Sequence, residues 1–375
     1  MKIALDGSFL KFPFTGIGRY TELLLKQYLR IFPHHKYLLY RLVGLRHFFS
    51  ASQFPSKGLE PVAVKTPFIW GSLMQRLRDF GPVDSFFLKD IDVFHGHAPY
   101  LPSLTHEPTV VMTIHDVIPL LYPEYVSRSA QVAWSSFGRK LPAISKFIAD
   151  SESTKNDFMR EFNLPPEKIV VIPLAVSSLF TNLKQPPETA EITASLGLDG
   201  EFILTVGRIE PRKNLLRLIQ AYDKLRQTKK FSGKLVIVGA KGWDAEKFEE
   251  ALRKSPFKND ILWLGYLPDT ALVSLYHAAS VFAFVSLYEG FGFPLLEAFA
   301  CGVPVVASSA SSLPEIGGEA AIYVNPFDTE AICQGLDVAL HDQEKRTELV
   351  QKGRTRLSHY SWEKTARETF KHYEL

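Results

Sequence analysis

Residues 201–325 contain six short apolar runs separated by longer, more polar stretches, and this alternation leaves few folds open. The runs are FILTVG, KLVIVG, ILWLG, VFAFVS, VPVVAS and AIYVN. Residues 215–224 and 244–253, which lie between runs, read as helical segments. Strands that alternate with helices form parallel sheets with right-handed crossovers. We therefore predict a parallel sheet here, with ligands bound at the carboxyl ends of its strands.

The first half of the chain shows the same alternation. KIALDG opens it as a short strand, residues 21–32 have a helical apolar stripe, and residues 93–95, 110–114 and 169–172 read as further strands. Residues 151–162 are predicted to form a helix capped by Ser153 or Thr154. From residue 177 to 200 the pattern stops, and Pro186 and Pro187 indicate a linker.

Together these patterns predict two Rossmann-like domains, which fits a length of 375 residues. The first spans residues 1–176, the linker 177–200 and the second 201–359. A last helix within residues 360–375 is predicted to cross back onto the first domain. No apolar stretch reaches the ~18 residues of a membrane span, and a strand directly after Met1 argues against a signal peptide. Cys301 and Cys333 lack metal-ligand spacing, which favours reduced thiols and a cytoplasmic setting.

Positive charge is concentrated in residues 1–60. This segment carries nine Lys and Arg against three acidic residues, a balance of +6 in a chain whose total is +3. It is also rich in aromatic residues: Phe32, Tyr37, Tyr40, Phe48 and Phe49. Such a surface could contact an anionic membrane peripherally, or it could be a solvated face over an ordinary core. No nucleic-acid-binding module accompanies the charge, so we expect no nucleic-acid partner.

The stretch EGFGFPLLEAFACGVPVV, residues 289–306, carries the strongest local signal. Pro294 suits the first turn of a helix and Gly302 suits the position after its end, so the helix is predicted between Gly292 and Cys301. The N–H groups of residues 291–293 would then face a ligand as an anion site. Glu289 lies before this helix and Glu297 inside it, eight residues apart.

That spacing places the two carboxylates on the order of 8–12 Å apart, from the rise of a helix. It suits a grip on both ends of an extended ligand with an anionic middle, such as a nucleotide-sugar. In TVGRIEPRKNL, a strand ends at Gly207 and is followed by Arg208 and Lys213. Two cations at the carboxyl end of a strand can neutralise a diphosphate without a metal ion.

These motifs together resemble the retaining glycosyltransferases of the GT-B family 4. The resemblance rests on GRIEPRKN and EGFGFPLLEA, and on GIGRY, TIHD, SEST, LYHAASVFAFVS, PEIGG and SWEKTARE in the same order. It implies a metal-independent, retaining transfer of a hexose from a UDP- or GDP-linked sugar to a saccharide or lipid-linked saccharide in polysaccharide or lipopolysaccharide biosynthesis. GDP-mannose and UDP-glucose both remain open as donors. The first domain would bind the acceptor and the second the donor.

The resemblance also implies roles for individual residues. Arg208 and Lys213 would bind the diphosphate, Glu297 the ribose and Glu289 the transferred sugar. His115 would lie near that sugar and the attacking oxygen, with Asp116 beside it as a further catalytic candidate. The remaining donor contacts would come from Gly207, Val238, Gly239, Leu267, Gly290, Phe291 and Gly292.

Further candidates lie in the first domain. Gly16 and Gly18 in TGIGRY either offer backbone N–H groups to the donor or form only a tight turn. Arg19, His95 and His97 are candidate acceptor contacts, although strand-end histidines are often structural.

Some patterns carry no function. Asp90 and Asp92 spell DxD but precede a strand, which is the wrong end for chemistry in a parallel sheet, so we interpret them as turn residues. GAKG lacks the ending of a phosphate loop, and no GxGxxG follows the first strand, which disfavours an ATPase and a dehydrogenase. A nucleotide-sugar epimerase and a non-catalytic nucleotide-sugar-binding protein remain alternatives.

Overall fold

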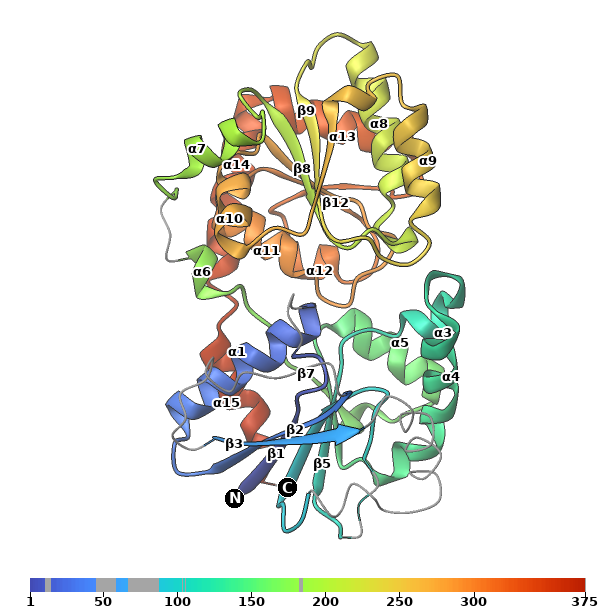
Figure 1. Ribbon diagram of the computed structural model, residues 1–375, viewed down its shortest axis with the longest axis vertical. Helices are drawn as coiled ribbons and strands as arrows, with labels where there is room; N and C mark the ends of the chain where they lie inside the picture. The colour runs from blue at the N-terminus through green and yellow to red at the C-terminus, as the bar shows by residue number, and fades with distance from the viewer. Residues whose placement is uncertain are drawn as a thin grey trace. The chain divides into compact units, whose positions relative to one another are not determined.

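The computed structural model describes residues 1–10, 15–44, 59–66, 88–102, 104, 106–181 and 185–374. The chain divides into two compact units. The first unit contains residues 1–120, 128–174 and 362–375, and the second contains residues 121–127 and 175–361. Each unit is built on a parallel sheet (Figure 1).

The first unit holds a seven-stranded sheet with the order β3-β2-β1-β4-β5-β6-β7. Its strands are β1 (Lys2–Asp6), β2 (Lys36–Gly44), β3 (Leu59–Thr66), β4 (Val93–His97), β5 (Thr109–Ile114), β6 (Lys146–Ala149) and β7 (Ile169–Val171). All neighbouring strands pair in parallel, and Leu5 of β1 lies opposite His95 of β4. The carboxyl ends of β4 and β5 therefore lie side by side.

Helices of the first unit include one from the far end of the chain. The described helices of residues 1–174 are α1 (Gly16–Ile31), α3 (Ile118–Leu121), α4 (Arg128–Phe137) and α5 (Glu152–Phe162), with short 3-10 turns η5 (Gly138–Ala143) and η6 (Pro166–Lys168). The turn η4 (Pro123–Tyr125) belongs to the second unit. The last helix, α15 (Trp362–Lys371), packs on α1 (Figure 1). Phe32 stacks on Phe370 with ring centroids 3.9 Å apart, and the hydroxyls of Tyr28 and Tyr373 lie 2.8 Å apart. The predicted return of the last helix to the first domain is confirmed.

Two predicted helix starts were wrong by a few residues. Helix α5 is capped by Ser151, whose hydroxyl accepts from the Thr154 N–H at 3.1 Å, because Ser151 is extended and the helix begins directly after it. Helix α1 begins at Gly16, so Gly16 and Gly18 form its first turn and do not precede it.

Two aromatic residues of the basic segment 1–60, Tyr37 and Tyr40, belong to the core, so the prediction that they form a surface is wrong. Tyr37 and Tyr40 belong to β2, which lies between β1 and β3, and both are fully buried. Strands inside a parallel sheet are covered on both faces, so their aromatic residues pack in the core. Phe48 and Phe49 lie outside the described residues.

The second unit holds a six-stranded sheet with the order β10-β9-β8-β11-β12-β13. The strands are β8 (Phe202–Val206), β9 (Lys234–Val238), β10 (Ile261–Gly265), β11 (Val281–Phe284), β12 (Val305–Ser308) and β13 (Ile322–Val324). All six predicted runs are strands, and they pair in parallel.

Helix α8 (Leu215–Gln227) packs against both α9 (Glu246–Lys254) and α13 (Thr329–His341), and the apolar faces of the three helices close the main core. Figure 1 shows α8 and α9 on one side of the sheet and α10 on the other. Further helices of the second unit are α10 (Asp269–Ala278), α11 (Phe293–Ala300), α12 (Leu313–Gly317) and α14 (Gln343–Leu357), with the 3-10 turns η7 (Pro211–Lys213) and η8 (Lys258–Asp260).

Residues 177–200, predicted to be a linker, contain two short helices that belong to the second unit. Helices α6 (Ser178–Thr181) and α7 (Thr189–Ser195) pack on α10. Phe180 is buried with its ring 5.8 Å from that of Tyr276, which holds α6 in place despite the prolines that follow. Residues 182–184 lie outside the described part.

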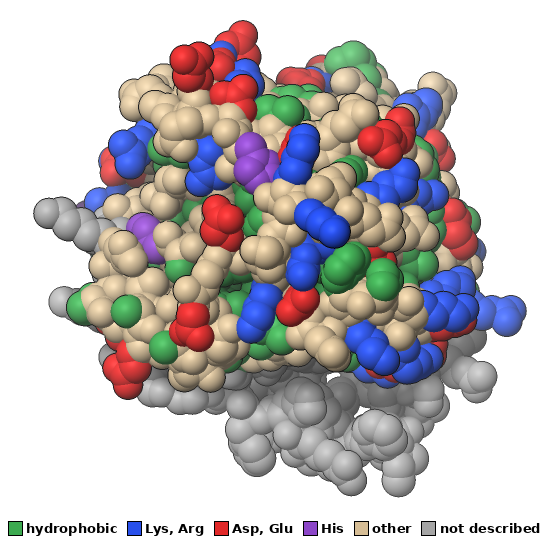
Figure 2. Space-filling model, turned by 90° about the horizontal axis from the view of Figure 1, so that it is seen from above, with side chains coloured by type: hydrophobic (Ala, Val, Ile, Leu, Met, Phe, Trp, Pro, Cys, Tyr) green, Lys and Arg blue, Asp and Glu red, His purple; other side chains and the backbone are tan. Residues whose placement is uncertain are grey.

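On the face shown in Figure 2, acidic and basic side chains both occur across the surface. Two ion pairs of the second unit, Lys224–Glu330 and Lys241–Glu249, lie at the protein surface. Among the described helices, none combines the length and apolar character that a membrane crossing requires.

Candidate active site

The turn after β8 brings the predicted cations to the carboxyl edge of the second sheet. The chain leaves β8 at Val206 and reaches α8 through η7. Between η7 and α8, Asn214 adopts a left-handed conformation (φ 59°), which Asn tolerates better than most residues. Its amide donates to the carbonyls of Val285 at 3.0 Å and Pro326 at 2.6 Å. Asn214, which sequence reasoning missed, thus ties this turn to the segments after β11 and β13.

Three predicted donor residues, Gly207, Val238 and Gly239, lie together where β8 and β9 end. Gly207 and Gly239 follow β8 and β9, and a Cβ on Gly239 would lie 1.9 Å from the Gly207 carbonyl oxygen. A Cβ on Gly207 would lie 2.9 Å from Cε of Lys213. Val238 ends β9 and is buried. The two glycines are therefore required by the close approach of the two strand ends and of the lysine side chain.

Glu289 lies at the centre of the charged groups. Its carboxylate accepts from Lys213 Nζ at 2.5 Å and from Arg212 Nη1 at 2.8 Å, and the residue is 8% exposed. Burial alone would raise the pKa of Glu289, but Arg212 and Lys213 outweigh it and lower that pKa to about 2. Glu289 is therefore a carboxylate held by two cations.

Lys213 is itself enclosed. Burial and the neighbouring Arg212 lower the pKa of Lys213, while Glu289 opposes that shift. The ammonium lies 5.0 Å from the centre of the Phe284 ring. Its only hydrogen-bond partner recorded among the described residues is Glu289. A diphosphate that reaches this ammonium would therefore compete with, or share, the bond to Glu289.

Arg212 is a charged residue that sequence reasoning passed over. Its Nε lies 3.2 Å from Glu210 Oε2, and its Nη1 also contacts the Tyr288 carbonyl at 3.4 Å. Arg208, in contrast, is more than half exposed and approaches Glu210 Oε1 at 3.5 Å. The two residues share Glu210, but only Arg212 touches Glu289. The sequence EPRKN contains two adjacent cations, Arg212 and Lys213, and only Lys213 was predicted to be a site residue.

Helix α11 has the limits that the sequence predicted. It runs from Phe293 to Ala300, between Gly292 (φ 99°) and Cys301. The preceding loop, which includes Gly290 and Phe291, is held by two serines. The Glu289 N–H donates to Ser311 Oγ at 2.9 Å, and the Ser312 hydroxyl contacts the Glu289 and Phe291 carbonyls at 2.9 and 3.2 Å. The backbone before α11 is thus fixed independently of the Glu289 side chain.

Glu297 lies inside α11 and is 8% exposed. Its Oε2 accepts from the Tyr276 hydroxyl of α10 at 3.0 Å. Leu267 is half-buried in the turn between β10 and α10. Trp263 of β10 donates to the Gly239 carbonyl at 2.8 Å.

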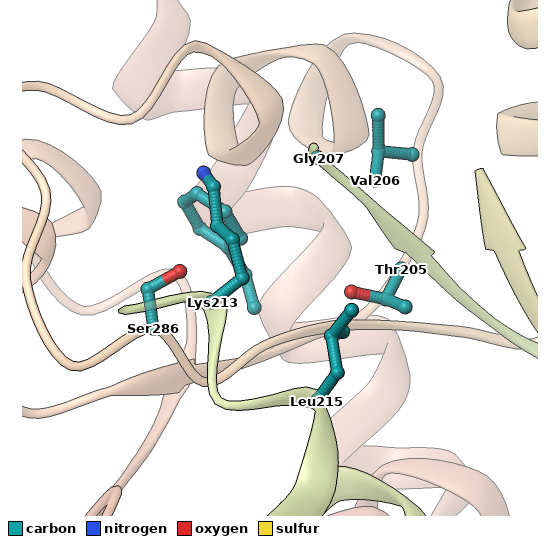
Figure 3. A pocket seen from close by; sticks show the side chains of 7 residues that line it. Thr205, Val206, Gly207, Lys213, Leu215 and Ser286 are labelled. Atoms are coloured by element: carbon teal, nitrogen blue, oxygen red, sulfur yellow. The ribbon is translucent and has the colours of Figure 1, made fainter. Parts of the chain in front are cut away.

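A shallow pocket lies at the carboxyl ends of β8 and β11 (Figure 3). Its lining residues are Thr205, Val206, Gly207, Lys213, Leu215, Phe284 and Ser286. The pocket therefore lies at the sheet edge where the sequence predicted a ligand. No cluster of three or more metal-ligating side chains occurs within the described ranges.

In the first unit, His115 follows β5 and has partners at both ring nitrogens. Its Nδ1 lies 2.6 Å from Asp150 Oδ2, and its Nε2 lies 3.0 Å from His97 Nδ1. His97 Nε2 lies 2.9 Å from the Thr21 hydroxyl oxygen. Asp150 follows β6, so the residues that hold His115 come from neighbouring strands and from α1.

His95 is part of the core and does not fit the predicted role of an acceptor contact. It is 2% exposed, and its nitrogens lie 2.5 Å from the Tyr373 hydroxyl and 2.8 Å from that of Thr113. Burial and the neighbouring His115 lower the pKa of His95 to about 3. His97 is equally buried, and both of its nitrogens contact protein atoms, so its contact with the acceptor stays a prediction without support from this geometry.

Other first-domain candidates have local structural contacts. Asp116 accepts from the Ile118 N–H at 3.1 Å and so caps α3. The Gly18 N–H donates to the Thr15 hydroxyl at 3.3 Å. Gly16 is exposed, and Arg19 is half-buried in the same turn of α1. Residues 11–14, directly before this turn, lie outside the described residues, so the donor contact of Gly16 and Gly18 stays a prediction.

The aspartates of the DxD sequence are turn residues, as predicted. Asp90 has a positive φ of 55°, and the Asp92 carboxylate accepts from the Lys2 N–H at 2.6 Å. Both lie at the amino end of β4, away from the carboxyl edge of the sheet.

Two sequence families match the chain. The family described as Glycosyltransferase Family 4 matches residues 16–178, and Glycosyl transferases group 1 matches residues 189–356. The O-antigen chain mannosyltransferase B of Escherichia coli is 30% identical over 388 aligned residues, which cover all of both chains. The serotype-specific mannosyltransferase WbdA of E. coli is 30% identical over 74% of this chain and 35% of its own length.

A similar solved structure is that of Anabaena Alr3699/HepE in complex with UDP and glucose. It superposes with a TM-score of 0.74 over 99% of this chain and 98% of that chain, at 18% identity. At this identity the likeness concerns the fold, and it agrees with the two parallel sheets described above.

Proposed function

The chain belongs to the family 4 glycosyltransferases and has their GT-B fold, and on this basis we propose that it is a retaining mannosyltransferase. Its substrates in this proposal are GDP-mannose and a saccharide, free or lipid-linked, in the assembly of a polysaccharide or lipopolysaccharide. The mannosyl specificity is supported by the two E. coli relatives, both named mannosyltransferases. UDP-glucose is the alternative donor, since a protein of the same fold binds UDP and glucose.

The observation that carries the proposal is the contact of Glu289 with Lys213 and Arg212 at the carboxyl edge of β8. A buried carboxylate with two cations can accept hydrogen bonds from sugar hydroxyls while the lysine turns toward a diphosphate. The rest of the donor would extend along α11, with Glu297 as acceptor for the ribose hydroxyls. Arg208, exposed on the same turn, is the second cation for the diphosphate.

In the proposed reaction the bond between the anomeric carbon and the diphosphate oxygen breaks, and a bond to the acceptor oxygen forms on the same face. Lys213 and Arg208 stabilise the negative charge that develops on the leaving diphosphate, as cations placed before the reaction can do at low cost. The acceptor proton passes to the leaving diphosphate. No metal ion takes part, and His115 keeps the role that the family resemblance implies.

A transfer assay tests this proposal. The protein is incubated in EDTA with GDP-mannose or UDP-glucose and a mannose-terminated oligosaccharide. We expect mannosyl transfer from GDP-mannose, with an α-linkage in the product by NMR. Transfer only after divalent cations are added would contradict the metal-independent mechanism, and a β-linked product would contradict retention. Interconversion of the sugar in the absence of acceptor would indicate an epimerase instead.

The proposal includes a peripheral contact with anionic membranes. Its support is the charge of +6 in residues 1–60, because the aromatic part of the earlier prediction is wrong for Tyr37 and Tyr40. Cosedimentation with vesicles of anionic and of zwitterionic lipid tests it. We expect binding only to anionic vesicles, and binding that salt weakens.

A further inference from the structure

A line of contacts through buried side chains leads from Asp150 to helix α1. Asp150 contacts His115, His115 contacts His97, and His97 contacts Thr21, at 2.6, 3.0 and 2.9 Å. Asp150, His97 and Thr21 are each at most 3% exposed. Buried polar groups need hydrogen-bond partners, and here each side chain supplies the next. Neither His97 nor Thr21 has a role in the function proposed above.

The hydrogens in this line can be counted, because one hydrogen must lie in each contact. The Asp150 carboxylate accepts a hydrogen bond, so His115 Nδ1 carries a hydrogen. His115 Nε2 and His97 Nδ1 face each other, and only one of these two nitrogens carries a hydrogen. In the first arrangement His97 Nδ1–H donates to a bare His115 Nε2, and the Thr21 hydroxyl donates to His97 Nε2. In the second, both nitrogens of His115 carry hydrogen, His97 Nε2–H donates to Thr21, and Thr21 donates to the Ile17 carbonyl, 3.1 Å away.

The second arrangement contains one proton more than the first. Burial and the neighbouring His115 and His95 hold the pKa of His97 well below its usual value, against a backbone hydrogen bond with Asp6 that raises it, so His97 carries one hydrogen in both arrangements. The other titratable side chain recorded against both rings is Tyr20, whose ring centre lies 4.9 Å from that of His115 and 5.6 Å from that of His97. In both arrangements His115 Nε2 and His97 Nδ1 are complementary, because one of them carries a hydrogen and the other accepts it.

We propose that His97 is a positioning residue for His115: it fixes the imidazole ring and sets whether His115 Nε2 carries hydrogen, and Thr21 sets the same for His97. This inference rests on the proposed function only where it concerns transfer. It does not require His97 to touch either substrate.

Two substitutions at one position separate the two contacts of His97. The amide atoms of Asn are as many bonds from Cα as His Nδ1, and those of Gln as many as His Nε2. His97→Asn therefore keeps a group against His115, and its amide can present either a donor or an acceptor. His97→Gln keeps a group against Thr21 and removes the contact with His115. Both variants lose an imidazole from the same buried position, so each controls for the other.

The ring signals of His115 in ¹⁵N-histidine-labelled protein give a readout that does not depend on activity. We expect the Asp150-bound Nδ1–H signal and the Nε2 signal to remain near wild type in His97→Asn and to shift in His97→Gln. His95→Gln identifies the signals of the other buried imidazole. In transfer assays kcat should fall about 10- to 100-fold in His97→Gln, with the donor KM unchanged, and stay within about threefold in His97→Asn.

Equal His115 signals in the two variants would overturn the proposal, and so would equal rates of transfer. If the wild-type protein transfers no sugar, the proposed function fails while the NMR comparison still decides the contact. If His97→Gln does not fold, Thr21→Val and Thr21→Ser replace the pair. Only Thr21→Val, which lacks the hydroxyl, should then shift the His97 and His115 signals.

Discussion

The Tyr276 hydroxyl donates to Glu297 Oε2 at 3.0 Å, and so joins the helix after β10 to the helix after β11. Tyr276 is fully buried, and Glu297 is 8% exposed. A buried phenol that donates to a carboxylate fixes the orientation of that carboxylate. The proposed ribose contact of Glu297 therefore depends on a residue that does not itself need to reach the ligand.

Tyr276→Phe should weaken donor binding. Loss of a hydrogen bond to a charged group costs about 1.5–3 kcal/mol. Because the Glu297 carboxylate would then be less well oriented for the donor, the donor KM should rise about 5- to 20-fold while kcat changes little. The steady-state constants with varied donor check this. Tyr222→Phe is the matched control, since Tyr222 is also buried in the second unit and its hydroxyl donates to the Gly233 carbonyl at 2.8 Å. A donor KM that rises equally in both variants would contradict the role of Tyr276.

Gly239→Ala should destabilise the second unit. The new methyl group would lie 1.9 Å from the Gly207 carbonyl oxygen, so the ends of β8 and β9 must separate. Overpacking of this kind costs about 1–3 kcal/mol, and a clash with backbone places the expected loss at the upper end. Urea denaturation measures it. Gly200→Ala is the control, because no atom lies within 4 Å of the Cβ position there, and its stability should change by less than about 0.5 kcal/mol. Equal midpoints for both variants would show that the strand ends are not closely packed.

Acid should destabilise the protein through His95, beginning at a pH above the range where carboxylates are protonated. The pKa of His95 is lowered from 6.5 to about 3 in the folded chain, by burial and by the neighbouring His115. As the pH falls from 6.5 towards 3, the unfolded chain takes up a proton at His95 that the folded chain does not, so the free energy of unfolding falls. The full slope for one such group is about 1.4 kcal/mol per pH unit.

His95→Gln should therefore make the pH dependence of stability shallower between pH 6 and pH 4, even if the variant is less stable at pH 7. Thermal or urea unfolding at several pH values tests this. The exposed His34→Gln, in the same unit, controls for the number of histidines. The same slope in His95→Gln and wild type would mean that His95 is not buried in its neutral form.

Much of the fold could be predicted from the sequence because its signals are local. The apolar runs of the second unit are short, bounded by glycine or polar residues, and separated by helices, and all of them are strands. Prediction failed where burial depends on neighbours in space. Tyr37 and Tyr40 lie in a basic, aromatic segment, and nothing nearby in the sequence shows that β2 is an inner strand between β1 and β3.

The site divides in the same way. Glu289, Glu297 and Lys213 could be found because glycine and proline mark the turn and the helix around them. Their partners could not, since the contacts span large distances in sequence. Arg212 lies 77 residues from Glu289, and Asp150 lies 35 residues from His115. For His95, the polar position at a strand end indicated function, but the C-terminal Tyr373, 278 residues away, makes it part of the core.

The central claim is that Lys213 holds the diphosphate of the donor without a metal ion, and titration calorimetry of GDP in EDTA tests it most directly. The account predicts that wild type and Lys224→Gln, a surface lysine paired with Glu330, bind GDP alike. Lys213→Gln should bind about 10- to 100-fold more weakly, as expected for loss of one charged hydrogen bond, while Arg212 still neutralises Glu289. Undiminished binding by Lys213→Gln, or wild-type binding that requires a divalent cation, would contradict the account.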